Sequence, residues 1–235
     1  MNNKNLENIN IIKNIKLDNF YLNNYKDFRE RIVEDIDQSD NVLDIGKSSR
    51  EFFNKIKSKK LTTLDINQFA DYPDIVLDLC DDLDDSLNEN FDKIICIAIL
   101  EHVYDPFKAV KNLKKFLKPG GTIYGYVPYL YSYHAPTNLK FQDYFRFSKD
   151  ALAYLFKDFD DLTLFPVRGR ISTSLNILLG NIWKKYFEKA RFHMFLDKLS
   201  NIKTNQTQCS GYNFIVKKKF NLLVQITFNL KKNSK

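Results

Sequence analysis

The chain has 235 residues, of which 44% are hydrophobic and 14% aromatic, and it carries a formal charge of +7. This length and apolar content predict one folded domain with a full core and exclude an intrinsically disordered chain. No apolar run is long enough for a membrane-spanning helix, and the polar start lacks the apolar core of a secretion signal, which favours the cytoplasm. Three widely spaced cysteines favour reduced packing residues over a disulfide or zinc set.

The charge is unevenly distributed along the chain. Residues 184–203 and 217–235 are basic, whereas residues 71–89 are acidic. A basic C-terminal third could approach an anionic membrane surface or a phosphorylated substrate, although a solvated basic face is the commoner outcome. We therefore do not expect a nucleic-acid partner and keep peripheral membrane contact open. The pattern does not predict an oligomeric state.

Taken in chain order, the sequence begins with a polar, asparagine-rich stretch, which predicts a loosely held arm over residues 1–16 and a single domain over residues 17–235. Asp18 is a candidate cap for the first helix of that domain. Predicted helices lie at about residues 20–36, 50–58, 105–117 and 148–156. Predicted strands lie at about residues 41–46, 61–66, 74–79, 91–98, 122–128, 162–167 and 211–218.

This alternation of strands and helices predicts an α/β fold with a doubly wound, mostly parallel sheet of seven strands. A helical insertion over about residues 171–203 precedes the last strand. Its apolar residues are interleaved with lysines, so it could lie on a membrane, cover the active site or join two subunits. Covering the site or packing on the core is the commoner outcome for such a segment.

Acidic residues stand at the ends of three predicted strands, at Asp44, Asp65 and Asp78. Parallel sheets bind ligands beyond the carboxyl ends of their strands, where the strand order reverses. Asp65 follows the first strand by about twenty residues, which is where dinucleotide folds place the carboxylate that binds ribose hydroxyls. The spacing therefore predicts a nucleoside site at this edge of the sheet.

The order of these residues resembles the class I S-adenosylmethionine-dependent methyltransferases. The resemblance rests on residues 42–46, 100–106 and 117–121, which occur together, in order and at the family's spacing. It covers residues 28–167 and returns at residues 212–218. It implies a Rossmann-like methyltransferase fold and S-adenosylmethionine as the cofactor.

The resemblance also implies roles for individual residues. Asp44 would lie near the amino group of the methionine moiety or a water bound to it, Asp65 would accept hydrogen bonds from the ribose hydroxyls, and Asp78 would accept one from the adenine amine. His102 would lie at the edge of the cofactor, or alternatively pack against the neighbouring helix. The implied cofactor-binding residues are Asp44, Gly46, Lys47, Asp65, Ile66, Asp78, Leu79, Ala98 and His102.

The loop after the first strand departs from the family pattern. Most relatives have a Gly-x-Gly run there, whereas only Gly46 is present here, followed by Lys47, Ser48 and Ser49. Lys47 could pair with the methionine carboxylate or repel the sulfonium. Two interpretations are open: a cofactor loop with altered contacts, or a domain that no longer methylates.

Residues 127–148 resemble the His-x-x-Pro and Asp-Tyr-Trp-Arg-Phe-Thr element of bacterial methyltransferases associated with sugars and surface glycans. Phe145 and Ser148 replace the tryptophan and the threonine. The resemblance implies a loop on which aromatic residues stack against a sugar. The candidate substrate-binding residues are Tyr129, Tyr133, Tyr144 and Arg146. An ion pair of Asp143 with Arg146 that only anchors the loop is an equal alternative.

His134 is the only histidine on this predicted acceptor loop. A sugar hydroxyl must lose its proton to attack a methyl group, and an imidazole titrates near neutral pH. We therefore predict His134 as the general base, with Asp143 as the substitute candidate. The acidic run at residues 81–85 lacks the spacing of metal ligands, and we predict no metal.

The leading hypothesis is an S-adenosylmethionine-dependent methyltransferase that O-methylates a sugar or glycan intermediate. One alternative is methylation of another small molecule, including an amine. Another is a non-catalytic methyltransferase-fold module that binds a partner through its basic C-terminal third. A nucleotide-sugar dehydrogenase is less favoured, because the first loop lacks the three-glycine fingerprint and residues 119–121 precede a strand.

Overall fold

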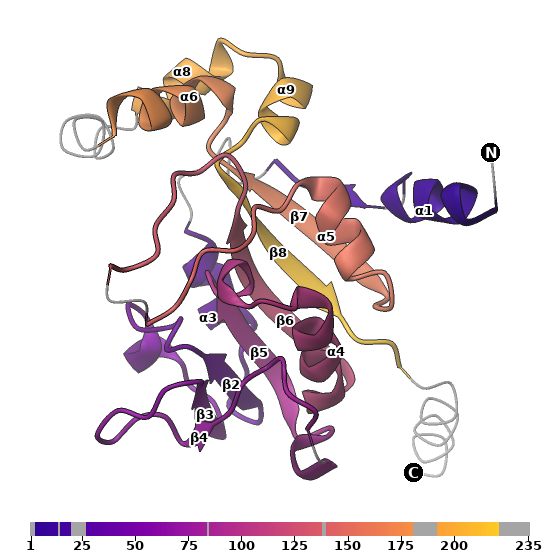
Figure 1. Ribbon diagram of the computed structural model, residues 1–235, viewed down its shortest axis with the longest axis vertical. Coiled ribbons are helices and arrows are strands. Elements are labelled where there is room, and N and C mark those ends of the chain that lie inside the picture. Colours follow the sequence, from indigo (N-terminus) through magenta and orange to yellow (C-terminus); the bar gives the residue numbers. More distant parts are fainter. Residues whose placement is uncertain are drawn as a thin grey trace.

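The computed structural model describes residues 3–13, 15–19, 27–83, 85–137, 140–180 and 192–220. These residues form a sheet of eight strands in the order β1-β7-β8-β6-β5-β2-β3-β4 (Figure 1). The strands are β1 (Lys16–Leu17), β2 (Asn41–Ile45), β3 (Lys60–Asp65), β4 (Ile75–Val76), β5 (Phe91–Ile97), β6 (Leu117–Pro128), β7 (Asp161–Val167) and β8 (Gly211–Lys217). Only β8 runs antiparallel to its neighbours, β6 and β7.

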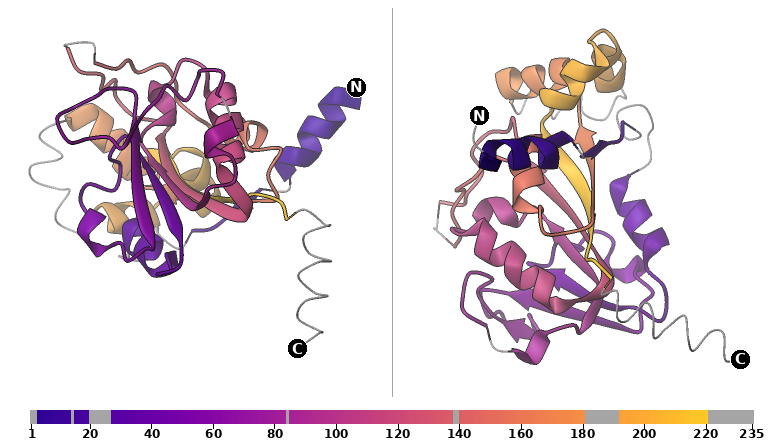
Figure 2. Two further views of the ribbon diagram at one scale, coloured as in Figure 1. Left: turned by 90° about the horizontal axis from the view of Figure 1, so that it is seen from below. Right: turned by 90° about the vertical axis from the view of Figure 1, so that its right-hand side faces the viewer.

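Helices cover both faces of the sheet. The α-helices are α1 (Asn3–Lys13), α3 (Phe28–Asp35), α4 (Pro106–Phe116), α5 (Lys149–Leu155), α6 (Arg170–Leu179), α8 (Phe192–Lys198) and α9 (Ile202–Thr207). Three short 3-10 helices are η1 (Phe53–Lys55), η2 (Asp85–Leu87) and η3 (Leu100–His102). Helices α4 and α5 lie on one face of the sheet and α3 lies on the other, as Figure 2 shows.

Side chains of the central strands alternate between two hydrophobic cores. Leu43 and Ile94 face the core beneath α4 and α5, whereas their neighbours Val42 and Ile95 face the core beneath α3. Successive side chains of a strand point to opposite faces, so a strand covered on both sides must be apolar throughout. The doubly wound arrangement predicted from these runs is confirmed, with β1 as an additional edge strand.

Side-chain caps fix where two predicted helices begin. The Asp105 carboxylate accepts a hydrogen bond from the Lys108 N–H at 3.0 Å, and Pro106 occupies the first helical position of α4. The Ser148 hydroxyl accepts one from the Ala151 N–H at the start of α5. Both predicted helices are confirmed to within two residues at each end.

Two other predicted helices differ from the structure. Helix α3 begins at Phe28 and is capped by Asp27. Asp18, the predicted cap, lies outside this helix, and its backbone N–H donates a hydrogen bond to the Leu164 carbonyl oxygen of β7. Residues 20–26 of the prediction lie outside the described residues. The helix predicted at residues 50–58 is wrong, because only turns and η1 occur there. Phe52 is its one buried aromatic residue, so the segment has no apolar stripe to stabilise a helix by packing.

The N-terminal segment is more regular than the predicted arm. Residues 3–13 form α1, which contacts α5, and residues 16–17 form the edge strand β1 beside β7. The boundary expected between residues 16 and 17 therefore falls inside a strand.

The predicted insertion between β7 and β8 is helical where it is described, and it continues into α9; residues 181–191 of it lie outside the described residues. The buried Asp197 carboxylate accepts hydrogen bonds from the Gly169 and Ser172 backbone N–H groups and from the Ser172 hydroxyl. Asn205 accepts another from the Arg170 N–H. Helices α6, α8 and α9 therefore form one unit beyond the end of the sheet (Figure 1). Within the described part of the chain, no helix is long and apolar enough to cross a membrane.

Candidate active site

A cavity of about 820 Å³ opens at the carboxyl ends of β2, β3 and β5. Strand β2 pairs with β3 on one side and with β5 on the other, so the strand order reverses at this point. Loops that follow neighbouring strands diverge at such a reversal and leave a crevice between them. The cavity therefore lies where the sequence predicted a nucleoside site.

Asp65 and Asp78 line one end of the cavity. The Asp65 carboxylate accepts hydrogen bonds from the Asn67 N–H at 3.0 Å and from the Tyr72 hydroxyl at 3.2 Å. Asp78 accepts one from the Cys80 N–H at 2.8 Å. A carboxylate has about four acceptor positions, so both side chains are held in place and can still accept from a ligand. This end of the cavity fits a ribose and an adenine amine.

The loop after β2 brings its backbone close to the cavity. Gly46 has φ +62°, and a Cβ atom there would lie 2.5 Å from the Ile99 side chain. Only glycine fits such a position without displacing its neighbour. The next residue, Lys47, also lines the cavity, and its ammonium lies 5.2 Å from the centre of the Tyr72 ring. Tyr72 thus joins Lys47 to Asp65 at this end of the cavity.

Asp44 is buried and does not line the cavity. Its buried carboxylate accepts hydrogen bonds from the Ser49 hydroxyl at 2.5 Å, the Ser49 N–H at 3.1 Å and the Ser48 hydroxyl at 2.9 Å. Burial raises the pKa of this carboxyl group, and the serine bonds oppose that rise. These contacts give Asp44 a role in shaping the glycine-poor loop, and its place near the methionine amino group, directly or through a water, stays a prediction.

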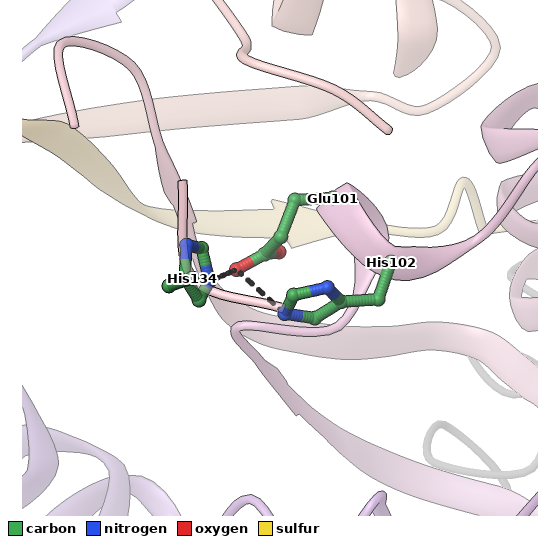
Figure 3. A group of neighbouring side chains, drawn as sticks. All are labelled: Glu101, His102 and His134. Atoms are coloured by element: carbon green, nitrogen blue, oxygen red, sulfur yellow. Dashed lines mark ion pairs between the residues drawn. The ribbon is translucent and has the colours of Figure 1, made fainter. Parts of the chain in front are cut away.

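At the other end of the cavity, Glu101 lies between two imidazoles (Figure 3). Glu101 belongs to η3, just after β5, and is fully buried. Its Oε1 atom is 3.8 Å from Nε2 of His102 and 3.8 Å from Nε2 of His134. Its backbone carbonyl accepts hydrogen bonds from the N–H groups of Tyr144 and Phe145. The acceptor loop predicted from the sequence is thereby tied to the end of β5.

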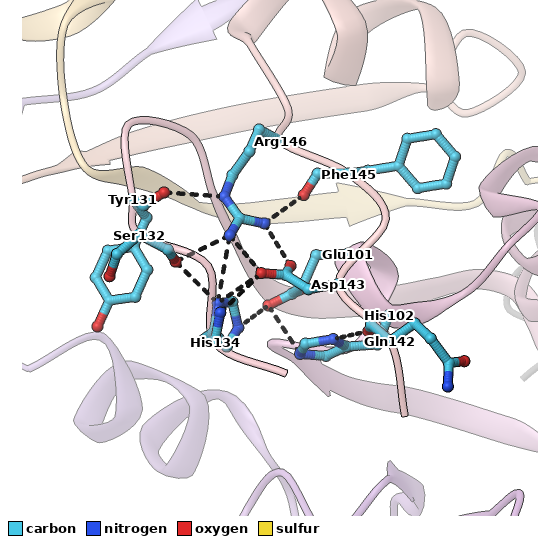
Figure 4. Close-up of polar contacts among 9 residues, drawn as sticks. All are labelled: Glu101, His102, Tyr131, Ser132, His134, Gln142, Asp143, Phe145 and Arg146. Atoms are coloured by element: carbon cyan, nitrogen blue, oxygen red, sulfur yellow. Dashed lines mark hydrogen bonds and ion pairs between the residues drawn. The ribbon is translucent and has the colours of Figure 1, made fainter. Parts of the chain in front are cut away.

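Asp143 and Arg146 form a clamp behind His134 (Figure 4). Arg146 donates to both Asp143 oxygens at 2.5 Å, and the His134 N–H donates to Asp143 at 2.9 Å. The other guanidinium hydrogens bond the carbonyl oxygens of Tyr131, Ser132 and Phe145. All five donors of the guanidinium are therefore used within the protein. The loop-anchoring ion pair, one of the two predicted alternatives, is present.

The charges of this clamp separate the two predicted base candidates. The Arg146 guanidinium lowers the pKa of Asp143 to about 2, which makes Asp143 a poor proton acceptor near neutral pH. The nearby Glu101 carboxylate raises the pKa of His134, burial opposes the rise, and Asp143 adds to it. His134 lines the cavity and Asp143 does not. Asp143 is therefore placed to orient His134.

The remaining predicted residues divide by their place relative to the cavity. The predicted cofactor residues that line it are Gly46, Lys47, Asp65, Ile66, Asp78, Leu79, Ala98 and His102. Of the predicted substrate residues, Tyr144 lines it, whereas Tyr133 is 70% exposed outside it. Tyr129 packs beside Tyr212, with 6.1 Å between the ring centres. Neither Tyr129 nor Arg146 is placed to meet a ligand in this cavity.

Several residues of the site were not predicted as site residues, among them Glu101, Tyr72, Phe141, Phe69 and Tyr104. Glu101 was part of a matching motif, but nothing in the sequence shows that its carboxylate points between two histidines. Tyr72 lies in an acidic loop, and the only sequence feature that could have indicated a role in the site is that it is aromatic. Phe141 lines the cavity and lies 4.5 Å from the His102 ring, measured between ring centres.

A family model described as "Methyltransferase domain" matches residues 17–160, which is more than half of the chain. A curated relative, the ubiquinone biosynthesis O-methyltransferase of Coxiella burnetii, is 31% identical over 94 residues. That match covers 40% of this chain and 32% of the relative, so the two share about a third of the relative's length.

Solved structures share the fold at low identity. A SAM-dependent methyltransferase from Archaeoglobus fulgidus matches with a TM-score of 0.53 and 18% identity. That match covers 80% of this chain and 90% of the Archaeoglobus fulgidus chain. A Thermotoga maritima protein, described as a possible histamine N-methyltransferase, matches with a TM-score of 0.51 and 14% identity. That match covers 92% of this chain and 96% of the Thermotoga maritima chain. With the sheet order and the cavity at its reversal point, these findings show that the chain belongs to the methyltransferase domain family and has the fold of S-adenosylmethionine-dependent methyltransferases.

Proposed function

We propose that the protein transfers a methyl group from S-adenosylmethionine to a hydroxyl group of a small acceptor. The observation that carries this proposal is a single cavity with Asp65 and Asp78 at one end and His102 and His134 at the other. When bound, S-adenosylmethionine supplies a methyl carbon on a sulfonium, and the sulfur keeps the bonding electron pair when the acceptor oxygen displaces it. The protein's part is to align that oxygen, to exclude water and to take up the hydroxyl proton, a step that we assign to His134.

The acceptor that we propose first is a sugar or glycan intermediate. The resemblance of the acceptor loop supports it, as do the aromatic side chains that line the cavity, because aromatic faces stack on sugar rings. These side chains are Phe69, Tyr72, Tyr104, Phe141 and Tyr144. A phenolic hydroxyl is the second candidate, favoured because the curated relatives are described as ubiquinone biosynthesis O-methyltransferases. The same aromatic lining would hold a flat phenol.

A labelled-methyl assay tests the proposal. Purified protein would be incubated with methyl-labelled S-adenosylmethionine and a panel of sugar nucleotides, catechols and amines. We expect label in a hydroxyl acceptor together with an equal amount of S-adenosylhomocysteine. Label only in an amine would redirect the proposal to N-methylation. An intact protein that binds neither S-adenosylmethionine nor S-adenosylhomocysteine would support the non-catalytic module.

Replacing Asp65 with alanine should weaken S-adenosylhomocysteine binding by roughly 1–3 kcal/mol, because charge-assisted hydrogen bonds to the ribose hydroxyls are lost. Isothermal titration calorimetry measures this directly. Asp71→Ala is the matched control, since Asp71 is exposed in the same loop and does not line the cavity. Equal binding by both variants would place the cofactor elsewhere.

Lys47→Met should weaken S-adenosylhomocysteine binding by roughly 1.5–3 kcal/mol, the range for a hydrogen bond to a charged group. Lys47 lines the cavity beside Tyr72 and is proposed to meet the cofactor's carboxylate. Lys55→Met, at an exposed lysine outside the cavity, is the control for loss of a positive charge. Tighter binding of S-adenosylmethionine by Lys47→Met would mean that the ammonium repels the sulfonium.

A further inference from the structure

The Glu101 carboxylate is buried without a hydrogen bond. Within the part of the chain that the structure describes, neither Oε1 nor Oε2 has a hydrogen-bond partner, and the side chain is fully buried. Removing a carboxylate from water without replacing its hydrogen bonds costs several kcal/mol, so buried charges are usually paired or coordinate a metal ion. The two imidazoles at 3.8 Å are too far away to hydrogen-bond it.

The hydrogen bond on the far side of His102 determines which ring nitrogen faces Glu101 with a free electron pair. Nδ1 of His102 lies 2.5 Å from the carbonyl oxygen of Gln142 (Figure 4). A carbonyl oxygen only accepts, so Nδ1 carries the hydrogen. In the neutral ring, Nε2 therefore has none and presents its electron pair toward Glu101.

His134 is arranged in the same way. Its Nδ1 lies 3.3 Å from Asp143 Oδ2 and 3.3 Å from the Ser132 carbonyl oxygen, and both of these are acceptors. Nη2 of Arg146 is farther, at 3.5 Å, and its hydrogens are used by Ser132 and Asp143. Nδ1 therefore donates, and Nε2 of the neutral ring faces Glu101 without a hydrogen.

Two nitrogen electron pairs and a carboxylate oxygen thus face one another. The three ligand atoms lie within 4.8 Å of each other (Figure 3). While both rings are neutral, such a group is repulsive unless a cation lies between its members. Ligands about 2.0–2.1 Å from a tetrahedral zinc ion are about 3.4 Å apart, so the observed 3.8 Å from Oε1 to each imidazole needs only small side-chain rotations to close on an ion.

We propose that Glu101, His102 and His134 bind a divalent transition-metal ion, with zinc as the best match to a set of two imidazoles and one carboxylate. Zinc sites that act on substrates have three such protein ligands and an open position. The contacts to Gln142 and Asp143 orient the two imidazoles, as outer partners of metal-binding histidines do. The described residues of the acidic run, 81–83 and 85, contribute no ligand to this group.

The open position of this site faces the cavity. His102 and His134 line the cavity, whereas Glu101 lies behind them. An acceptor hydroxyl that enters from the cavity can bind the ion there, and a zinc-bound hydroxyl releases its proton near neutral pH far more readily than a free one. This role in acceptor binding rests on the proposed function, but the metal site itself does not.

Metal titration of the chelator-treated full chain tests the site. Zinc is titrated by calorimetry and cobalt(II) by its visible absorption, both without cofactor or acceptor. We expect one equivalent to bind with a Kd on the order of 1 μM or tighter. In the variants Glu101→Gln and His102→Ala, the affinity for zinc should fall by more than about 100-fold. This exceeds the 10–100-fold loss caused by removing a residue that only hydrogen-bonds a metal ligand.

Controls separate a lost ligand from a lost fold. His193→Ala, which removes the remaining histidine of the chain, should bind zinc as the parent does. S-adenosylhomocysteine binding by Glu101→Gln reports that the variant is folded, and zinc should raise the Tm of the parent but not of this variant. Absence of saturable zinc binding by the parent, or equal binding by Glu101→Gln, would overturn the proposal. Asp65→Ala should retain zinc while losing cofactor affinity, so failure of one proposal is distinguishable from failure of the other.

Discussion

His134→Ala should lower the rate of methyl transfer by about 10²–10⁴-fold, the range for losing a group that assists removal of a proton. The imidazole lines the cavity beside Glu101, at the part of it that we propose holds the acceptor. Affinity for S-adenosylhomocysteine should therefore stay within about twofold of the parent's, because a lost reaction-specific contact lowers kcat without changing cofactor binding.

The measurement uses an acceptor found in the labelled-methyl panel, with kcat and KM determined separately and cofactor affinity measured by calorimetry. Turnover close to the parent's would remove His134 from the mechanism. The zinc content of the same variant distinguishes two routes to the loss. If His134→Ala loses both its bound metal and its activity, His134 acts through the ion. If the variant loses activity but retains the metal, the imidazole takes the proton itself.

Arg146→Met should lower the free energy of unfolding by about 3 kcal/mol, at the lower end of the range for breaking a buried ion pair because Arg146 is a quarter exposed. The Asp143 carboxylate is fully buried and, among the described residues, would keep as donors only the backbone N–H of His134 at 2.9 Å and the Nδ1 of the same residue at 3.3 Å. Three backbone carbonyls of the loop would also lose their donor. Methionine retains much of the packing volume, so the lost charge dominates.

Urea unfolding monitored by circular dichroism gives this free energy, provided that the denaturant slope is unchanged. Arg29→Met is the matched control. Arg29 pairs with Asp27 and Glu51 at the surface, and an exposed ion pair contributes only about 0–1 kcal/mol. A loss below about 1 kcal/mol for Arg146→Met would show that the clamp does not hold the loop.

Much of the fold could be predicted because its signals are local. The strand at residues 41–46, the caps Asp105 and Ser148, and the last strand each depend on short runs of sequence whose periodicity or capping residue is visible directly. Asp65 and Asp78 could be placed together in advance because parallel strands bring their carboxyl ends to one edge. The helix predicted at residues 50–58 failed because its apolar residues do not form a face that the sheet covers.

The direction of polar side chains could not be predicted in this way. Asp44 was expected near the cofactor's amino group, and only the structure shows that its carboxylate accepts hydrogen bonds from two serines of the next turn. From the sequence, Arg146 was an equal candidate for binding a substrate and for anchoring the loop. In the structure, all of its donors bond Asp143 and three backbone carbonyl groups, which favours the anchor. A residue type states which bonds a side chain can make, and only its neighbours determine which of them it makes.

The sequence by itself determined the doubly wound sheet, the crevice at its reversal point and two of the carboxylates that line it, Asp65 and Asp78. Only the tertiary structure decided that Glu101, His102 and His134 converge. These residues come from the ends of β5 and β6, and they meet because residues 144 and 145 of the returning loop bond the Glu101 carbonyl. That convergence depends on a loop folding back across the sheet edge, which no periodicity in the chain encodes.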